Sequence, residues 1–123
     1  MTCPFCQTIP PEKMLFETEH FRAFLDGFPV SPGHTLLVPH RHVASFFELS
    51  PEERSDLQLC ILRAKDLLDG QYHPDGYNIG VNVGEAAGQS VFHVHIHVIP
   101  RYSGDTPHPR GGVRGVIPGK QAY

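Results

Sequence analysis

The segment from His93 to Arg101 constrains the fold more than any other part of the chain. It reads His-Val-His-Ile-His-Val-Ile-Pro-Arg, so that an imidazole alternates with a β-branched apolar residue. Successive side chains of a strand point to opposite faces of a sheet. The segment therefore predicts a strand with one histidine face and one buried apolar face, carrying His93, His95 and His97 on the first and Val94, Ile96 and Val98 on the second.

The three histidines indicate a functional site. One histidine on a strand is usually structural, but three in register just after Gly88-Gln89-Ser90 are poorly explained that way. An imidazole acts near neutral pH as a metal ligand, a general acid or base, or a nucleophile. The row spans about 13 Å at about 3.3 Å per residue, so one ion binds two of them at most. A catalytic zinc held by two histidines of the row remains an alternative.

The rest of the chain predicts a small α+β fold. Ser50-Pro51-Glu52-Glu53 is a capping box with proline at the first helical position, and it predicts a helix that runs to Asp69-Gly70. Strands alternating with turn-rich stretches are predicted at 14–19, 21–26, 35–39, 77–82 and 92–99. Because only one long helix accompanies them, we expect a five-stranded antiparallel sheet with one long and one short helix.

Composition and charge limit the number of domains and the classes of partner that we expect. With 123 residues and 40% hydrophobic residues, the chain 1–123 is expected to form one domain, small enough that a dimer would help to stabilise it. The formal net charge of −3 argues against binding to nucleic acid. No apolar run approaches membrane-spanning length and no signal peptide follows Met1, so we expect no membrane contact and a cytoplasmic protein.

The three cysteines have separate interpretations. Cys3 and Cys6 form a Cys-x-x-Cys motif, which is typical of a redox pair, a structural zinc site or two free thiols. A redox pair is disfavoured, since such motifs lie between a strand and a helix and only two residues precede Cys3. A structural zinc requires two further ligands. Cys60 lies in the helical pattern and is predicted to be a small core or interface residue.

The histidine row resembles the His-x-His-x-His-x-x signature of the histidine triad family. The resemblance extends upstream through Gly88-Gln89-Ser90-Val91 and through 24–26 and 32–39, and it covers most of 3–101. Members of that family transfer or hydrolyse nucleoside monophosphoryl groups. The resemblance implies a nucleotide hydrolase or nucleotidyl transferase that cleaves at the α-phosphate of a purine nucleoside phosphoramidate or a dinucleoside polyphosphate. It also implies a homodimer with a continuous ten-stranded sheet.

In that chemistry His95 attacks the α-phosphorus and forms a nucleotidyl-histidine, which water then cleaves. The ring must be neutral, and we expect a backbone carbonyl to accept a hydrogen bond from its other nitrogen. The resemblance implies that His97 contacts the α-phosphate and that Gln89 and Ser90 lie at the bridging and leaving-group oxygens. It also implies that Asn82 orients the phosphate and the leaving group and that Asp26 binds the ribose hydroxyls. Apolar candidates to contact the base are Phe5, Phe21 and Leu25. His34, at a strand start, is expected only to hold a turn.

The resemblance also implies ligands that complete a zinc site. Relatives with the N-terminal Cys-x-x-Cys motif, including the galactose-1-phosphate uridylyltransferase group, add two histidines to the two cysteines. Mapped onto this chain, the set is Cys3, Cys6, His42 and His93. The expected role is structural, and no organic cofactor is expected.

The C-terminal residues 101–123 form a basic segment rich in proline and glycine. It holds four basic residues and one acidic residue. We interpret it as an arm that folds back, with Arg110 and Arg114 meeting the phosphates beyond the α position; a solvated basic tail is the alternative. For the whole protein, two other functions stay open: a nucleotide-binding module without turnover, and a metal-dependent hydrolase using two histidines of the row.

Overall fold

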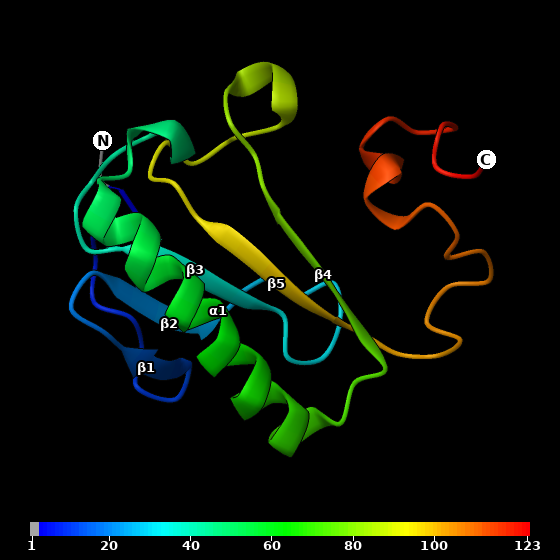
Figure 1. Ribbon diagram of the computed structural model, residues 1–123, viewed down its shortest axis with the longest axis horizontal. Helices are drawn as coiled ribbons and strands as arrows, with labels where there is room; N and C mark the ends of the chain where they lie inside the picture. Colours follow the sequence, from blue (N-terminus) through cyan, green and yellow to red (C-terminus); the bar gives the residue numbers. More distant parts are fainter. Residues whose placement is uncertain (1–2) are drawn as a thin grey trace.

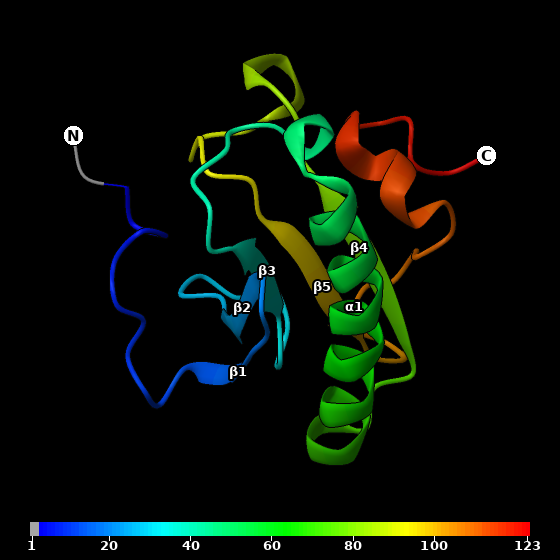
Figure 2. The ribbon, with the colours of Figure 1, turned by 60° about the vertical axis from the view of Figure 1, so that its left-hand side comes forward.

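The computed structural model describes residues 3–123 and contains a five-stranded antiparallel sheet. The strands lie in the order β1-β2-β3-β5-β4, and the long helix α1 covers one face (Figures 1 and 2). The sheet and the single main helix confirm the predicted fold class. The elements are β1 (Met14–Glu17), β2 (Phe21–Leu25), β3 (Thr35–Pro39), α1 (Pro51–Tyr72), β4 (Gly76–Val81) and β5 (Ile96–Arg101), with short 3-10 helices η1 (Phe46–Glu48), η2 (Glu85–Ala87) and η3 (Gly112–Val116).

The helix begins as predicted. The Ser50 hydroxyl accepts from the Glu53 backbone N–H at 3.1 Å, and the Glu53 carboxylate accepts from the Ser50 N–H at 2.8 Å. That carboxylate is buried and also paired with Arg41 at 2.8 Å. The helix runs two residues past Gly70 and ends at Tyr72, because His73 takes the left-handed conformation (φ 51°) that closes its last turn.

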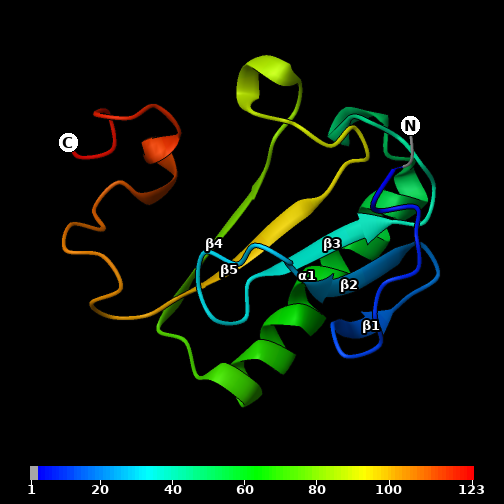
Figure 3. The same cartoon turned by 180° about the vertical axis from the view of Figure 1, so that it is seen from behind.

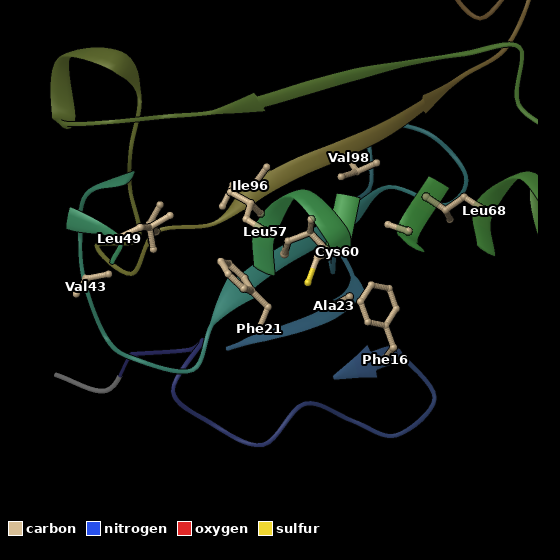
Figure 4. Packing of buried hydrophobic residues seen from close by; sticks show 13 residues of the cluster. Phe16, Phe21, Ala23, Val43, Leu49, Leu57, Cys60, Leu68, Ile96 and Val98 are labelled. Atoms are coloured by element: carbon tan, nitrogen blue, oxygen red, sulfur yellow. The ribbon is translucent and has the colours of Figure 1, made fainter. Parts of the chain in front are cut away.

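The main core lies between α1 and the sheet (Figure 4). Cys60 and Ala64 of the helix are fully buried, and Cys60 is the core residue that the helical pattern predicts. Phe21 of β2 is also fully buried on this side, so its predicted contact with a base is wrong. The buried residues of β5 are Ile96, Val98 and Pro100, and the first two confirm the apolar face of the histidine segment.

Strand β5 begins later than predicted, at Ile96 instead of Phe92. Its ladder with β3 pairs Thr35 with Val98 and Leu37 with Ile96. Continuing that register by two residues would bring Val94 opposite Pro39, which has no N–H to donate. Val94 instead donates its N–H to the carbonyl of Val43 at 2.8 Å. His93 and His95 therefore lie on a segment that leads into the strand, and only His97 lies within it.

Two segments cross the face of the sheet that α1 leaves uncovered (Figure 3). The N-terminal segment, residues 3–13, runs along β1 and β2. The loop 26–34 between β2 and β3 passes over β5. Phe5 and Ile9 of the N-terminal segment pack on a small second cluster of buried residues, which are Phe24, Leu36 and Val38. His95 and His97 lie on this side of the sheet, His95 against Phe5 of the N-terminal segment and His97 against His34 at the end of the loop.

The C-terminal arm folds on itself beyond β4 (Figure 1). The guanidinium groups of Arg110 and Arg114 stack on the ring of Tyr123, 4.7 and 4.8 Å from its centre. Gln121 adds hydrogen bonds to the carbonyls of His108 and Arg110. Within residues 3–123, no helix has both the length and the apolar character needed to cross a bilayer.

Candidate active site

His95 lies between β3 and the N-terminal segment, with its ring orientation fixed by the backbone. Its Nδ1 is 3.0 Å from the carbonyl oxygen of His93. A carbonyl only accepts, so Nδ1 carries the proton and Nε2 keeps its lone pair. The ring of Phe5 meets His95 edge-on at 4.9 Å between centroids. The backbone carbonyl expected as the partner of His95 is thus the one two residues upstream.

The Nε2 atoms of His95 and His97 are not fully buried. Among residues 3–123, neither Nε2 of His95 nor Nε2 of His97 has a hydrogen-bond partner. The one buried side-chain nitrogen or oxygen without a partner in that range is Nε of Arg22. Both imidazole nitrogens are therefore reachable by a ligand, and the two rings are 5.2 Å apart.

On one side of His95, four side chains form what we term the Cys/His cluster: Cys3, Cys6, His42 and His93. Their ligand atoms all lie within 4.8 Å of one another. His93 is fully buried, and its Nε2 donates to the carbonyl of Pro39 at 2.8 Å. Nδ1 of His93 is therefore unprotonated and faces the two sulfurs and His42, as a metal ligand requires.

The geometry of this cluster fits tetrahedral zinc. With Zn–S of about 2.3 Å and Zn–N of about 2.0–2.1 Å, tetrahedral ligand atoms are roughly 3.3–3.8 Å apart. The observed separations are 3.4 and 3.5 Å from Nδ1 of His93 to the two sulfurs and 3.2 Å from Nδ1 of His42 to Sγ of Cys6. The two Nδ1 atoms are 3.2 Å apart. These are the four residues implied by the resemblance.

On the other side of His95 lies the Asp/His cluster of Asp26, His34 and His97. Nε2 of His34 is 2.9 Å from Nδ1 of His97 and 3.4 Å from Oδ2 of Asp26. Burial, together with the neighbouring His95 and His34, lowers the pKa of His97 to about 4. Burial also lowers the pKa of His34, an effect that the Asp26 carboxylate partly offsets. Both rings are neutral at pH 7.

His34 does more than the turn residue predicted from its position. It is 3% exposed and ends the loop 26–34, within which its Nδ1 accepts a hydrogen bond from the Val30 N–H at 3.1 Å. A histidine after Pro-Gly at the start of a strand gave no signal of contact with His97, 63 residues away. The two carboxylate oxygens of Asp26 make different contacts: Oδ1 accepts from the Phe28 N–H at 2.8 Å in a turn, and Oδ2 lies 3.4 Å from Nε2 of His34.

The residues expected at the leaving group lie on the loop that precedes His93. Gln89 is 4% exposed, and its amide is engaged entirely by the backbone: Oε1 accepts from Gly84, and Nε2 donates to the carbonyls of Ala44 and Val91. The loop turns at Gly84 and Gly88, with φ of 88° and 93°. Ser90 is exposed and Asn82 half-buried. Gln89 thus shapes this loop, and backbone carbonyls use both N–H donors of the amide that was expected at the phosphate oxygens.

Arg110 and Arg114 lie apart from both clusters. Their guanidinium groups are stacked on Tyr123, and Nε of Arg114 donates to the carbonyl of Gln121. The arm lies beyond β4 (Figure 1). The Cys/His cluster combines two cysteines of the N-terminal segment with His42, after β3, and His93, before β5. Within one chain the structure does not bring these arginines to His95.

Comparison with known proteins identifies the family. A model of the HIT domain matches residues 7–104. The chain belongs to the HIT domain family. An uncharacterised HIT-like protein of Methanocaldococcus jannaschii is 43% identical over 106 residues, which are 84% of this chain and 81% of that protein. A bis(5'-nucleosyl)-tetraphosphatase (asymmetrical) of Schizosaccharomyces pombe is 34% identical over 93 residues, covering 76% of this chain and 51% of the relative.

Solved structures of the HIT domain family share the fold. A HIT family protein of Bacillus anthracis has a TM-score of 0.77 and 38% identity, with 84% of this chain and 75% of that chain covered. A histidine triad family protein of Mycobacterium smegmatis, described as zinc-bound, has a TM-score of 0.70 and 36% identity over 77% of this chain and 69% of its own. The family includes nucleotide hydrolases and at least one zinc-bound member.

Proposed function

We propose that the protein is a nucleotide hydrolase or nucleotidyl transferase that cleaves at the α-phosphate through a covalent nucleotidyl-histidine at His95. One observation carries the proposal: the His93 carbonyl accepts a hydrogen bond from Nδ1–H of His95, which leaves the Nε2 lone pair of the neutral ring as the nucleophile. The proposed substrates are purine nucleoside phosphoramidates or dinucleoside polyphosphates. The tetraphosphatase relative supports this class.

The other residues divide by what they face. We assign His97, beside His95 in the row, to a non-bridging oxygen of the α-phosphate, where charge develops in the transition state. We assign Asp26 to the ribose hydroxyls. Ser90 and Asn82 are assigned to the leaving group, and Gln89 to the shape of the loop that carries Ser90. Phe5, against His95, is the remaining candidate of the predicted set for contact with the base.

We assign a structural zinc to Cys3, Cys6, His42 and His93, with no organic cofactor. All four positions are filled by protein ligands, so a metal there would leave no open site for substrate. When bound, it would tie the N-terminal segment to the residue whose carbonyl orients His95. This gives the site a positioning role as well as a stabilising one.

The metal-dependent hydrolase is the weaker alternative, because His93 and His97 fall in different clusters. Among residues 3–123, no group of possible ligands contains two histidines of the row. A nucleotide-binding module without turnover would use the same residues around His95. Only a measured rate separates it from the proposal.

We further propose a homodimer joined through β4. This strand lies at the end of the sheet, and its Ile79 is 46% exposed. On the helix, Leu59 and Leu62 are 65% and 60% exposed. Pairing of two β4 edges would bury such residues and give a ten-stranded sheet. A cytoplasmic location and the absence of nucleic-acid binding stay predictions.

The decisive experiment traps the intermediate. In a rapid quench with a substrate radiolabelled at the α-phosphate, label should appear on His95 in an acid-labile bond. In the His95→Ala variant the label should vanish and turnover should fall by on the order of 10³-fold, because covalent catalysis is lost while packing is kept. His108→Ala, at an exposed histidine of the arm, is the matched control. Retention of a tenth of the wild-type rate by His95→Ala would refute the nucleophile.

A further inference from the structure

The protonation of His34 is settled by one backbone group. The Val30 N–H points at Nδ1 of His34 at 3.1 Å, so this nitrogen must present a lone pair. A doubly protonated ring would set two hydrogens against each other. In the neutral ring the proton therefore resides on Nε2. His34 is the tautomer protonated at Nε2.

This tautomer in turn decides that of His97. Nε2–H of His34 has two acceptors in reach: Nδ1 of His97 at 2.9 Å and Oδ2 of Asp26 at 3.4 Å. The nearer contact has ordinary hydrogen-bond length. Nδ1 of His97 must then be the acceptor, because a proton on it would meet the proton on Nε2 of His34. A neutral His97 therefore carries its own proton on Nε2, the nitrogen open to the site.

The same three residues also have the donor set of a two-histidine, one-carboxylate metal site. A metal at Nε2 of His34 would displace the proton from that nitrogen. Nδ1 would then need to carry it, facing the Val30 N–H. The hydrogen bond from Val30 thus disfavours a metal here and favours a fixed chain of donors.

We propose that His34 is a positioning residue that holds His97 in the Nε2–H tautomer, so that the active site offers a lone pair on His95 beside an N–H donor on His97. The chain runs from Val30 N–H to His34, from His34 to His97, and from His97 to the site. No proton has to move along it. The inference deepens the proposed function and rests on it for its catalytic meaning: the lone pair meets phosphorus, and the donor meets a non-bridging oxygen.

The tautomer is tested without substrate. Protonated and unprotonated ring nitrogens have well-separated ¹⁵N chemical shifts, and the His97 signals are assigned by their loss in His97→Gln. In the wild type we expect a proton on Nε2 of His97 and none on Nδ1. His34→Ala should let the ring sample both tautomers, whereas His34→Gln, with an amide N–H near the position of Nε2, should restore the wild-type pattern. A His97 proton on Nδ1 in the wild type, or a pattern unchanged in His34→Ala, would overturn the proposal.

The catalytic effect is tested on the same variants. We expect His34→Ala to lower kcat by about 10- to 100-fold, the range seen when a partner that orients an active imidazole is removed. KM should change little, because the ground-state contacts of the nucleotide remain. His34→Gln should recover most of the rate, and the control His108→Gln should match the wild type. Equal loss in both His34 variants would indicate a packing role and contradict the proposal. If the wild type shows no turnover, the proposed function fails, while the ¹⁵N result still decides the tautomer.

Discussion

The two clusters that flank His95 contain similar ligands but have opposite hydrogen-bond chemistry. In the Cys/His cluster, His93 donates a hydrogen bond from Nε2–H to the Pro39 carbonyl and turns an Nδ1 lone pair toward two thiols and His42. In the Asp/His cluster, His34 uses its Nδ1 lone pair to accept from the Val30 N–H and turns a proton toward His97. A backbone acceptor prepares one ring for a metal, and a backbone donor prepares the other for a hydrogen-bond chain.

The difference shows that residue type alone does not identify a metal site. In both groups the atoms that could bind a metal lie within 4.8 Å of one another. Each neutral imidazole has one lone pair, and the group that faces the second nitrogen decides where it points. His95 lies between the two and follows the same rule, since the His93 carbonyl leaves its Nε2 unprotonated. Three backbone groups therefore set three imidazoles to three tasks.

The largest effect should come from breaking the Cys/His cluster. We expect one zinc per chain by elemental analysis. Cys3→Ser should remove the zinc and lower the melting temperature in the same preparation, because binding to a closed structural site adds directly to folding free energy.

His34→Ala is the matched control and should keep the zinc, since His34 belongs to the other cluster. Two zinc ions per chain, or a metal-free protein with the stability of the wild type, would contradict the distinction between the clusters.

Acid should destabilise the Asp/His cluster in a defined window. The pKa of His97 lies at about 4 in the folded protein and near 6.5 when unfolded, so the unfolded chain binds the extra proton first. Stability linked to His97 is present above pH 6.5, is lost as the pH falls to 4, and changes no further below. The charged or titratable groups facing His97 are His95, His34 and Asp26.

Urea unfolding at pH 7 and pH 5 measures this linkage. Between the two, the wild type should lose about 2 kcal/mol more than His97→Gln, which keeps a neutral acceptor for His34. Release of the zinc would affect both proteins alike. Equal losses would show that His97 titrates normally in the folded state.

The smallest effect concerns the arm, which belongs to neither cluster. Arg110→Ala with Arg114→Ala should raise KM for a dinucleoside tetraphosphate several-fold more than for an adenosine phosphoramidate. The differential is about 1 kcal/mol if the guanidinium groups reach the distal phosphates. Lys120→Ala is the control, as an exposed basic residue of the same arm. Equal effects on both substrates would assign the arginines to the stacking on Tyr123 seen here.

Much of the fold and part of the site could be predicted from local patterns. The alternation in 93–99 predicted the buried face of β5, and the capping box fixed the start of α1 to the residue, because both signals depend on neighbours in sequence. The end of α1 and the start of β5 were misplaced. The left-handed conformation of His73 decided the first boundary, and Pro39 on the neighbouring strand decided the second.

The sequence by itself determined the family, the histidine row and the set of cysteines and histidines that fit zinc, since each is a matter of which residues stand at which spacing. Only the tertiary structure decided which nitrogen of each imidazole is free. For His93 this depends on the carbonyl of Pro39, 54 residues away, and for His97 on the ring of His34, 63 residues away. A proton has one position on a neutral ring, and no pattern along the chain records which neighbour folding brings to the other side.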